Sequence, residues 1–175
     1  MKKPLLFVIA LVAAIPAGAH AQVAQAKEGV RVKLPAWIEP VLLDTLRTEH
    51  HVAAMPEAVY SAVLKSFFDL GIPVGNTDNK AGIIGSERFE RSRTLGGAPM
   101  SRWLSCGDNA TGPNADSYRL TIAVAVWVKP DKGGGTLLST AIVASGMDVN
   151  GISRNPRECA STGRLEQKIV DLVQK

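Results

Sequence analysis

Two cysteines, Cys106 and Cys159, are the side chains whose chemistry this sequence defines best. In an oxidising compartment an even pair is typical of a disulfide, and closing a loop of about 50 residues contributes roughly 4 kcal/mol in the chain-entropy model. A catalytic cysteine would need a histidine base. The candidates, His50 and His51, are neighbours that would point to opposite faces of a strand. We therefore predict a disulfide between Cys106 and Cys159.

Three other patterns suggest chemistry, but each has a simpler structural explanation. Three glycines at 133–135 lie between two strand patterns, whereas a phosphate-binding loop is followed by a helix. Asp108, Asn109 and Asp116 crowd one loop without the spacing of a calcium-binding EF-hand, and these residue types are common in turns. The nucleophile elbow of serine hydrolases is absent. The sequence thus predicts no catalytic residue, no metal ligand and no cofactor.

Positive charge is concentrated in one strand and the loop that follows it. Such a patch attracts anions, and in a cell envelope the abundant anions are lipid head groups and lipopolysaccharide. The alternative is a solvated sheet edge, where charge prevents edge-to-edge aggregation. The candidate residues for contact with an anionic surface are Arg88, Arg91, Arg93 and Arg102.

The first 21 residues have the pattern of a bacterial signal peptide. A basic start at residues 1–3 is followed by an apolar run at residues 5–15 and by Ala-His-Ala at residues 19–21. The apolar run is shorter than the roughly 20 residues of a membrane-spanning helix, although an uncleaved anchor is the alternative interpretation. We expect cleavage before Gln22 and export to the periplasm. No cysteine follows the small residues, so we expect no lipid modification there.

The chain that remains after cleavage is only weakly basic. Loss of Lys2 and Lys3 lowers Lys+Arg from 20 to 18 against 16 Asp+Glu, a net charge of about +2. A nucleic-acid-binding protein usually has a larger, clustered excess of positive charge, so we expect no nucleic-acid partner. We divide the chain into a flexible or partly helical segment at 22–45 and a single α+β domain at 46–175.

Two helices are expected in this domain. The first begins at Pro56, which suits a first helical position, and ends at Gly71. The second covers about residues 161–173, with Ser161 or Thr162 as its cap. The first helix has an apolar stripe at helical spacing, for which core packing is the favoured role: Val59, Tyr60, Val63, Leu64, Phe67 and Phe68.

The rest of the domain has strand patterns, the strongest at residues 117–128, where apolar side chains alternate between two faces. Residues 96–116 are expected to be loop-rich and partly fixed to the core. These elements predict an α+β fold, in which an antiparallel sheet of about four to five strands has the long helix and the C-terminal helix packed on one face. The expected strands cover residues 46–53, 72–77, 83–93, 117–128 and 136–145.

This order resembles the helix-grip class of domain. Within that class, residues 51–173 are similar in layout to the domains of the C lipoprotein of the outer-membrane β-barrel assembly machinery. The similarity rests on residues 54–60, which open the long helix, on 70–74, which close it, and on 159–166, which enter the last helix. The resemblance implies a non-enzymatic accessory role. One departure is that the family is anchored by a lipid on an N-terminal cysteine, which this chain lacks.

Two functions are compatible with these features. The first is a non-catalytic periplasmic module that binds envelope proteins or lipids. The alternative is a small-ligand or lipid carrier, or a small enzyme, that uses a cavity between helix and sheet. A cavity lined by Phe67 and Tyr60 with a buried carboxylate would favour the carrier or the enzyme.

Overall fold

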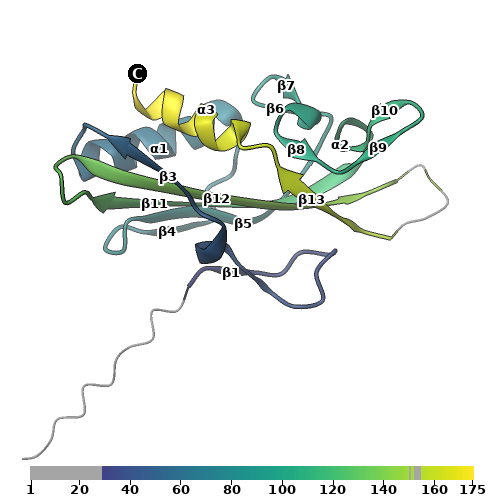
Figure 1. Ribbon diagram of the computed structural model, residues 1–175, viewed down its shortest axis with the longest axis horizontal. Helices are drawn as coiled ribbons and strands as arrows, with labels where there is room; N and C mark the ends of the chain where they lie inside the picture. The colour runs from purple at the N-terminus through teal and green to yellow at the C-terminus, as the bar shows by residue number, and fades with distance from the viewer. Residues whose placement is uncertain (1–28, 150, 152–154) are drawn as a thin grey trace, which may run out of the picture.

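A long hairpin of two strands, β11 (Arg119–Pro130) and β12 (Thr136–Met147), forms the centre of the structure (Figure 1). The computed structural model describes residues 29–149, 151 and 155–175, so the expected signal peptide lies outside the described residues. Gly135 in the connecting turn has a φ of +78°, and a Cβ there would lie 2.4 Å from the carbonyl oxygen of Val52. The turn therefore requires glycine.

The hairpin belongs to a seven-stranded antiparallel sheet. Its strand order is β4-β5-β11-β12-β13-β8, and β3 pairs with the same outer edge of β12 as β13 does. In β5, Ile84, Gly85, Ser86 and Phe89 are buried, and the strand pairs with β11 apart from one bulge near Ala123. The remaining strands are β3 (Thr48–Val52), β4 (Asn76–Asp78), β5 (Ile83–Ser92), β8 (Leu104–Ser105) and β13 (Arg157–Ser161).

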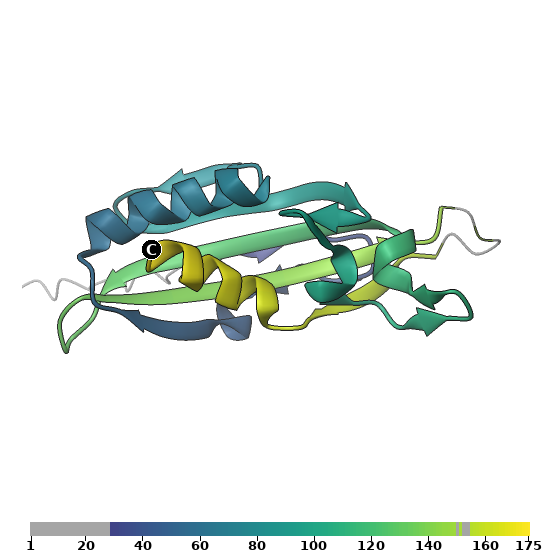
Figure 2. The ribbon, with the colours of Figure 1, turned by 90° about the horizontal axis from the view of Figure 1, so that it is seen from above.

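Two helices, α1 (Pro56–Leu70) and α3 (Arg164–Val173), lie side by side over one face of the sheet (Figure 2). Pro56 occupies the first turn of α1, and Gly71 ends the helix with a left-handed φ of 70°. The prediction that this helix packs on β11 is confirmed. Phe67 is fully buried, together with Val59, Val63 and the apolar side chains on one face of β11.

One residue of the predicted stripe lies outside the core. Phe68 is 84% exposed, so its assignment to the packed face is wrong. Phe67 and Phe68 are about 100° apart around the helix, and the buried stripe at this end runs through Val63, Phe67 and Leu70. Only one of two adjacent phenylalanines is therefore able to face the sheet.

The chain before β3 covers the opposite face of the sheet. It contains two short strands, β1 (Arg31–Val32) and β2 (Val41–Leu42), and the 3₁₀ helix η1 (Leu43–Leu46). Its buried side chains pack against a second cluster on β11 and β12, and the Arg47 guanidinium lies 3.9 Å from the centre of the Trp127 ring. The apolar residues that the segment buries are Val32, Leu34 and Leu43. We refer to residues 29–46 as the N-terminal segment.

Small elements connect β5 to β11 at one end of the sheet. As expected, parts of this stretch are fixed to the core: Trp103, Leu104 and Cys106 are buried, and the Trp103 indole donates a 3.0 Å hydrogen bond to the Leu95 carbonyl. The elements are β6 (Thr94–Leu95), β7 (Ala98–Pro99), η2 (Met100–Arg102), β9 (Asp108–Asn109), β10 (Gly112–Pro113) and α2 (Asn114–Ser117).

The predicted fold class is wrong. The structure is mostly β, with 43% of the described residues in strands and 25% in helices, and its main sheet has seven strands rather than four or five. The difference arises because β8 and β13 extend the sheet although they span only two and five residues. Strands this short show no sustained alternation of apolar side chains, so hydrophobic periodicity does not reveal them. The strand expected at 72–77 is also displaced, to Asn76–Asp78.

Candidate functional site

The outer edge of β12 is interrupted in the middle of the sheet. Residues 136–140 pair with β3, and residues 144–146 pair with β13. Between them, no described residue pairs with residues 141–143 on this side. The interruption arises because β13 leaves β12 after Cys159, and its next residue, Ala160, pairs with Ser105 of β8 instead.

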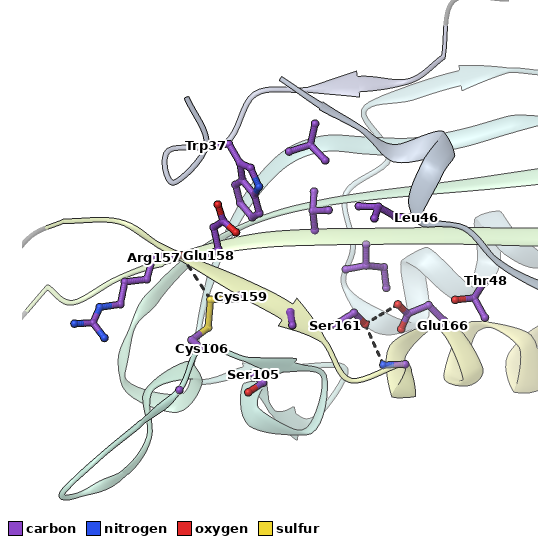
Figure 3. A pocket seen from close by; sticks show the side chains of 16 residues that line it. Trp37, Leu46, Thr48, Ser105, Cys106, Arg157, Glu158, Cys159, Ser161 and Glu166 are labelled. Atoms are coloured by element: carbon purple, nitrogen blue, oxygen red, sulfur yellow. Dashed lines mark hydrogen bonds between the residues drawn. A yellow bond between two sulfur atoms is a disulfide. The ribbon is translucent and has the colours of Figure 1, made fainter. Parts of the chain in front are cut away.

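A groove of about 880 Å³ occupies this interruption (Figure 3). Ile142 belongs to the core beneath the helices and Val143 to the core beneath the N-terminal segment, so the groove adjoins both faces of the sheet at its edge. Trp37, Val41 and Leu46 of the N-terminal segment form an apolar wall. The polar and charged lining comes from Thr48, Ser105, Arg157, Glu158, Ser161 and Glu166.

Glu166, in the first turn of α3, is the buried carboxylate of this groove. Its side chain is almost completely removed from solvent, with a residue exposure of 4%. One oxygen, Oε1, accepts a 2.6 Å hydrogen bond from the Ser161 hydroxyl, and that hydroxyl accepts a 3.1 Å hydrogen bond from the Gly163 N–H. The other oxygen, Oε2, is buried without a hydrogen-bond partner. The helix N-terminus favours a negative charge here but leaves Oε2 unsatisfied.

Other polar atoms near the β3–β12 pairing also lack partners. Thr140 Oγ1 and His50 Nε2 are both buried without a hydrogen-bond partner. Thr48 lines the groove and lies opposite Thr140, and His50 lies opposite Leu138, whose side chain belongs to the core beneath the helices. Opposed residues share a face of the sheet, so these polar side chains lie on the helix-covered face, as α3 does.

The predicted disulfide is confirmed and lies in the wall of the groove. Cys106 and Cys159 are bonded, with their Cα atoms 4.3 Å apart, inside the limit of about 7 Å that a disulfide permits. The bond joins the residue after β8 to β13, at the point where β13 changes its partner strand. The disulfide thus stabilises the position at which β13 leaves β12, and this separation of the two strands opens the groove.

The four candidate arginines do not form one surface. Arg91 lies opposite Leu120 on the helix-covered face, donates to the Gly71 carbonyl and lies 5.6 Å from the Phe89 ring centre. Arg88 lines a different, shallow pocket of about 110 Å³ with Arg119 and Glu90. Arg93 follows β5 with a φ of 67°, and Arg102 lies 5.3 Å from the Trp103 ring centre. Contact with an anionic surface stays a prediction for these residues.

The groove is not the cavity between the long helix and the sheet on which the carrier or enzyme alternative depends. Phe67 is fully buried in the core, and Tyr60 lines a separate pocket of about 300 Å³ near Pro56 and Asn79. The expected cap of the last helix, Ser161 or Thr162, is wrong, because α3 has Gly163 as its N-cap and no side-chain cap hydrogen bond. Glu166 was not singled out from the sequence, because its distance of five residues from Ser161 does not match the three-residue spacing of a capping box.

The groove supplies hydrogen-bond acceptors and an apolar wall. Among the described residues, no group of three or more His, Cys, Asp or Glu side chains is arranged to hold a metal ion. An ion pair outside the groove, between His51 Nδ1 and Asp131 Oδ2 at 3.0 Å, lies beside the β11–β12 turn. The hydrogen bond from His51 lowers the pKa of Asp131.

The sequence was compared with protein-family models and with curated proteins, and neither comparison gives a match. Within the part of the chain that the structure describes, none of the helices combines the length and the apolar character needed to cross a bilayer. The functional interpretation therefore depends on the geometry of the groove itself.

Proposed function

We propose that this protein is a non-catalytic binding module of the cell envelope, which holds an amphipathic ligand in the groove beside β12. The volume of about 880 Å³ falls in the range of roughly 300–1,000 Å³ typical of small-molecule sites. Such sites combine apolar walls with a few placed polar groups, and here Trp37, Val41 and Leu46 accompany Glu166 and Ser161.

The observation that carries this proposal is the unsatisfied Oε2 of Glu166 in the lining of an open groove. A buried polar atom without a partner costs free energy, and a buried charge costs more. A bound molecule that donates a hydrogen bond would remove this cost. If Glu166 served only to stabilise the start of α3, it would not need to line a groove with an apolar wall.

A second candidate is an accessory protein of the envelope that binds other proteins, as the resemblance to the β-barrel assembly lipoprotein domains implies. Phe68 supports it, because this aromatic side chain is 84% exposed on the outer side of α1. Aromatic side chains are enriched at protein interfaces. The groove supports ligand binding more directly, because it contains a buried group that lacks a partner.

The test is binding of N-phenyl-1-naphthylamine, an apolar dye whose fluorescence rises away from water. Ala160 is exposed and lines the groove, so Ala160→Phe fills it without altering the core. Ala58 is exposed on α1 and does not line the groove, so Ala58→Phe is the matched control. We expect the dye to bind the wild type and Ala58→Phe equally and to lose at least about tenfold in affinity for Ala160→Phe. Equal binding to all three proteins would contradict the groove as the site.

A further inference from the structure

We infer that the ligand of this groove is a single-chain amphiphile with a cationic amine head group that pairs with Glu166. This inference rests on the proposed function and adds the chemistry of the head group and its orientation. The head group lies beside the Oε2 atom of Glu166, and the hydrocarbon chain lies along Trp37, Val41 and Leu46.

The first argument is the hydrogen-bonding capacity of the carboxylate. An ionised carboxylate only accepts hydrogen bonds, so Oε2 requires a donor. The nearest hydroxyl, that of Ser161, already donates to Oε1 at 2.6 Å. An ammonium group has three N–H donors and no acceptor. It can therefore donate to Oε2 without introducing an acceptor atom that would itself need a donor near the carboxylate. Charge-assisted hydrogen bonds of this kind are about twice as strong as neutral ones.

The second argument is the missing counter-charge. Among the described residues, the ion pairs Arg47–Asp44 and Lys65–Asp69 and the His51–Asp131 contact do not involve Glu166. Arg157 also lines the groove, but it is exposed and its side chain points away from Glu166 (Figure 3). A buried carboxylate without a cation is costly, and a ligand ammonium would supply the cation that the protein does not.

The third argument is that the charges disfavour an anionic head group. Glu158 lies at the same groove as Glu166, so a carboxylate or phosphate placed there would meet two acidic side chains and one arginine. The apolar wall belongs to the N-terminal segment on one face of the sheet and Glu166 belongs to α3 on the other, and Ile142 and Val143 at the edge of β12 also line the groove. A molecule that reaches from the wall to Glu166 therefore needs an apolar body and a donor at one end.

The experiment compares three probes with the same chain, dodecylamine, dodecanol and dodecanoate, each below its micellar concentration at about pH 7. Each displaces N-phenyl-1-naphthylamine from the full-length mature protein. Glu166→Gln removes the negative charge and keeps the side-chain volume and an acceptor for Ser161. Glu57→Gln makes the same chemical change in the first turn of α1, at an exposed position outside the groove.

We expect dodecylamine to bind the wild type at least about tenfold more tightly than dodecanoate. Glu166→Gln should weaken dodecylamine binding by about tenfold or more and leave dodecanol binding within about threefold, whereas Glu57→Gln should leave both within about threefold. Three outcomes would overturn the inference of an amine head group: equal affinity for the three probes, a preference for dodecanoate, or an unchanged dodecylamine affinity in Glu166→Gln. Each of them would leave the proposal of ligand binding intact. If neither the dye nor any chain binds the wild type, the proposed function fails as well.

Discussion

Cys159 pairs with Ala144 of β12 and is bonded to Cys106, and the next residue of its strand pairs with β8. The disulfide therefore sits at the point where β13 changes partners. We expect the double variant Cys106→Ala/Cys159→Ala to lose about 2–4 kcal/mol of unfolding free energy, because the unfolded chain is no longer constrained. Denaturant titration measures this loss.

We also expect weaker binding of N-phenyl-1-naphthylamine to the double-cysteine variant under conditions where the variant is still folded. Full dye affinity in that variant would contradict a role for the disulfide in shaping the groove.

Phe67 and Phe68 are adjacent and provide a matched test of which face of α1 is packed. Phe67 is fully buried, so Phe67→Ala should cost about 3–5 kcal/mol through lost burial and the cavity it leaves. Phe68→Ala removes an exposed side chain and should change the free energy of unfolding by less than about 0.5 kcal/mol. Thermal and denaturant melts compare the two. Similar melting temperatures for both variants would mean that α1 does not pack as described.

Ser161 connects the start of α3 to Glu166. Ser161→Ala removes the donor to Glu166 Oε1 and the acceptor of the Gly163 N–H. We expect a loss of about 1–2 kcal/mol in unfolding free energy, because both hydrogen bonds of the Ser161 hydroxyl are removed. Thr162→Ala is the comparison variant, because the Thr162 hydroxyl donates to the carbonyl oxygens of Arg102 and Trp103 rather than to Glu166. Weaker dodecylamine binding in Ser161→Ala but not in Thr162→Ala would show that Ser161 positions Glu166.

The His51–Asp131 pair predicts a small dependence of stability on acid pH. The His51 hydrogen bond lowers the pKa of Asp131 below its ordinary 3.8, so the interaction stabilises the folded state above that value. The contribution is lost as the pH falls through the lowered folded-state pKa. Unfolding curves of the wild type and Asp131→Asn should therefore differ most above about pH 4 and converge in stronger acid. A difference that grows as the pH falls would contradict this assignment.

Export, with cleavage of the chain before Gln22, is a prediction from sequence alone. The pattern of a basic start, an apolar run and Ala-His-Ala places cleavage between Ala21 and Gln22. Intact mass spectrometry of the protein from a periplasmic extract should give a chain that begins at Gln22. Retention of Met1 in that material would indicate an uncleaved anchor instead.

Local sequence patterns predicted the elements that bury long apolar stripes. The α1 helix between Pro56 and Gly71 and the strands β11 and β12 lie close to their expected positions, because periodic burial leaves a clear pattern in the sequence. The cysteine pair was predictable for a different reason, since two thiols in an oxidising compartment have few other roles.

The groove was not predictable in this way. It depends on β3 and β13 sharing one edge of β12 and leaving residues 141–143 between them, and this register joins segments nearly a hundred residues apart. No local periodicity encodes such a pairing. Glu166 was missed for a related reason: its sequence neighbourhood predicts an ordinary first helical turn, and only the three-dimensional structure shows that one of its oxygens is buried without a partner.

The two walls of the groove come from opposite ends of the described chain. Trp37 and Leu46 are among the first described residues to be synthesised, whereas Ser161 and Glu166 are among the last. A ribosome makes the chain from its N-terminus, so the complete lining cannot exist until α3 has been released. Ligand binding of the kind proposed above would therefore follow synthesis, and a chain truncated before α3 would lack the carboxylate proposed to hold the head group.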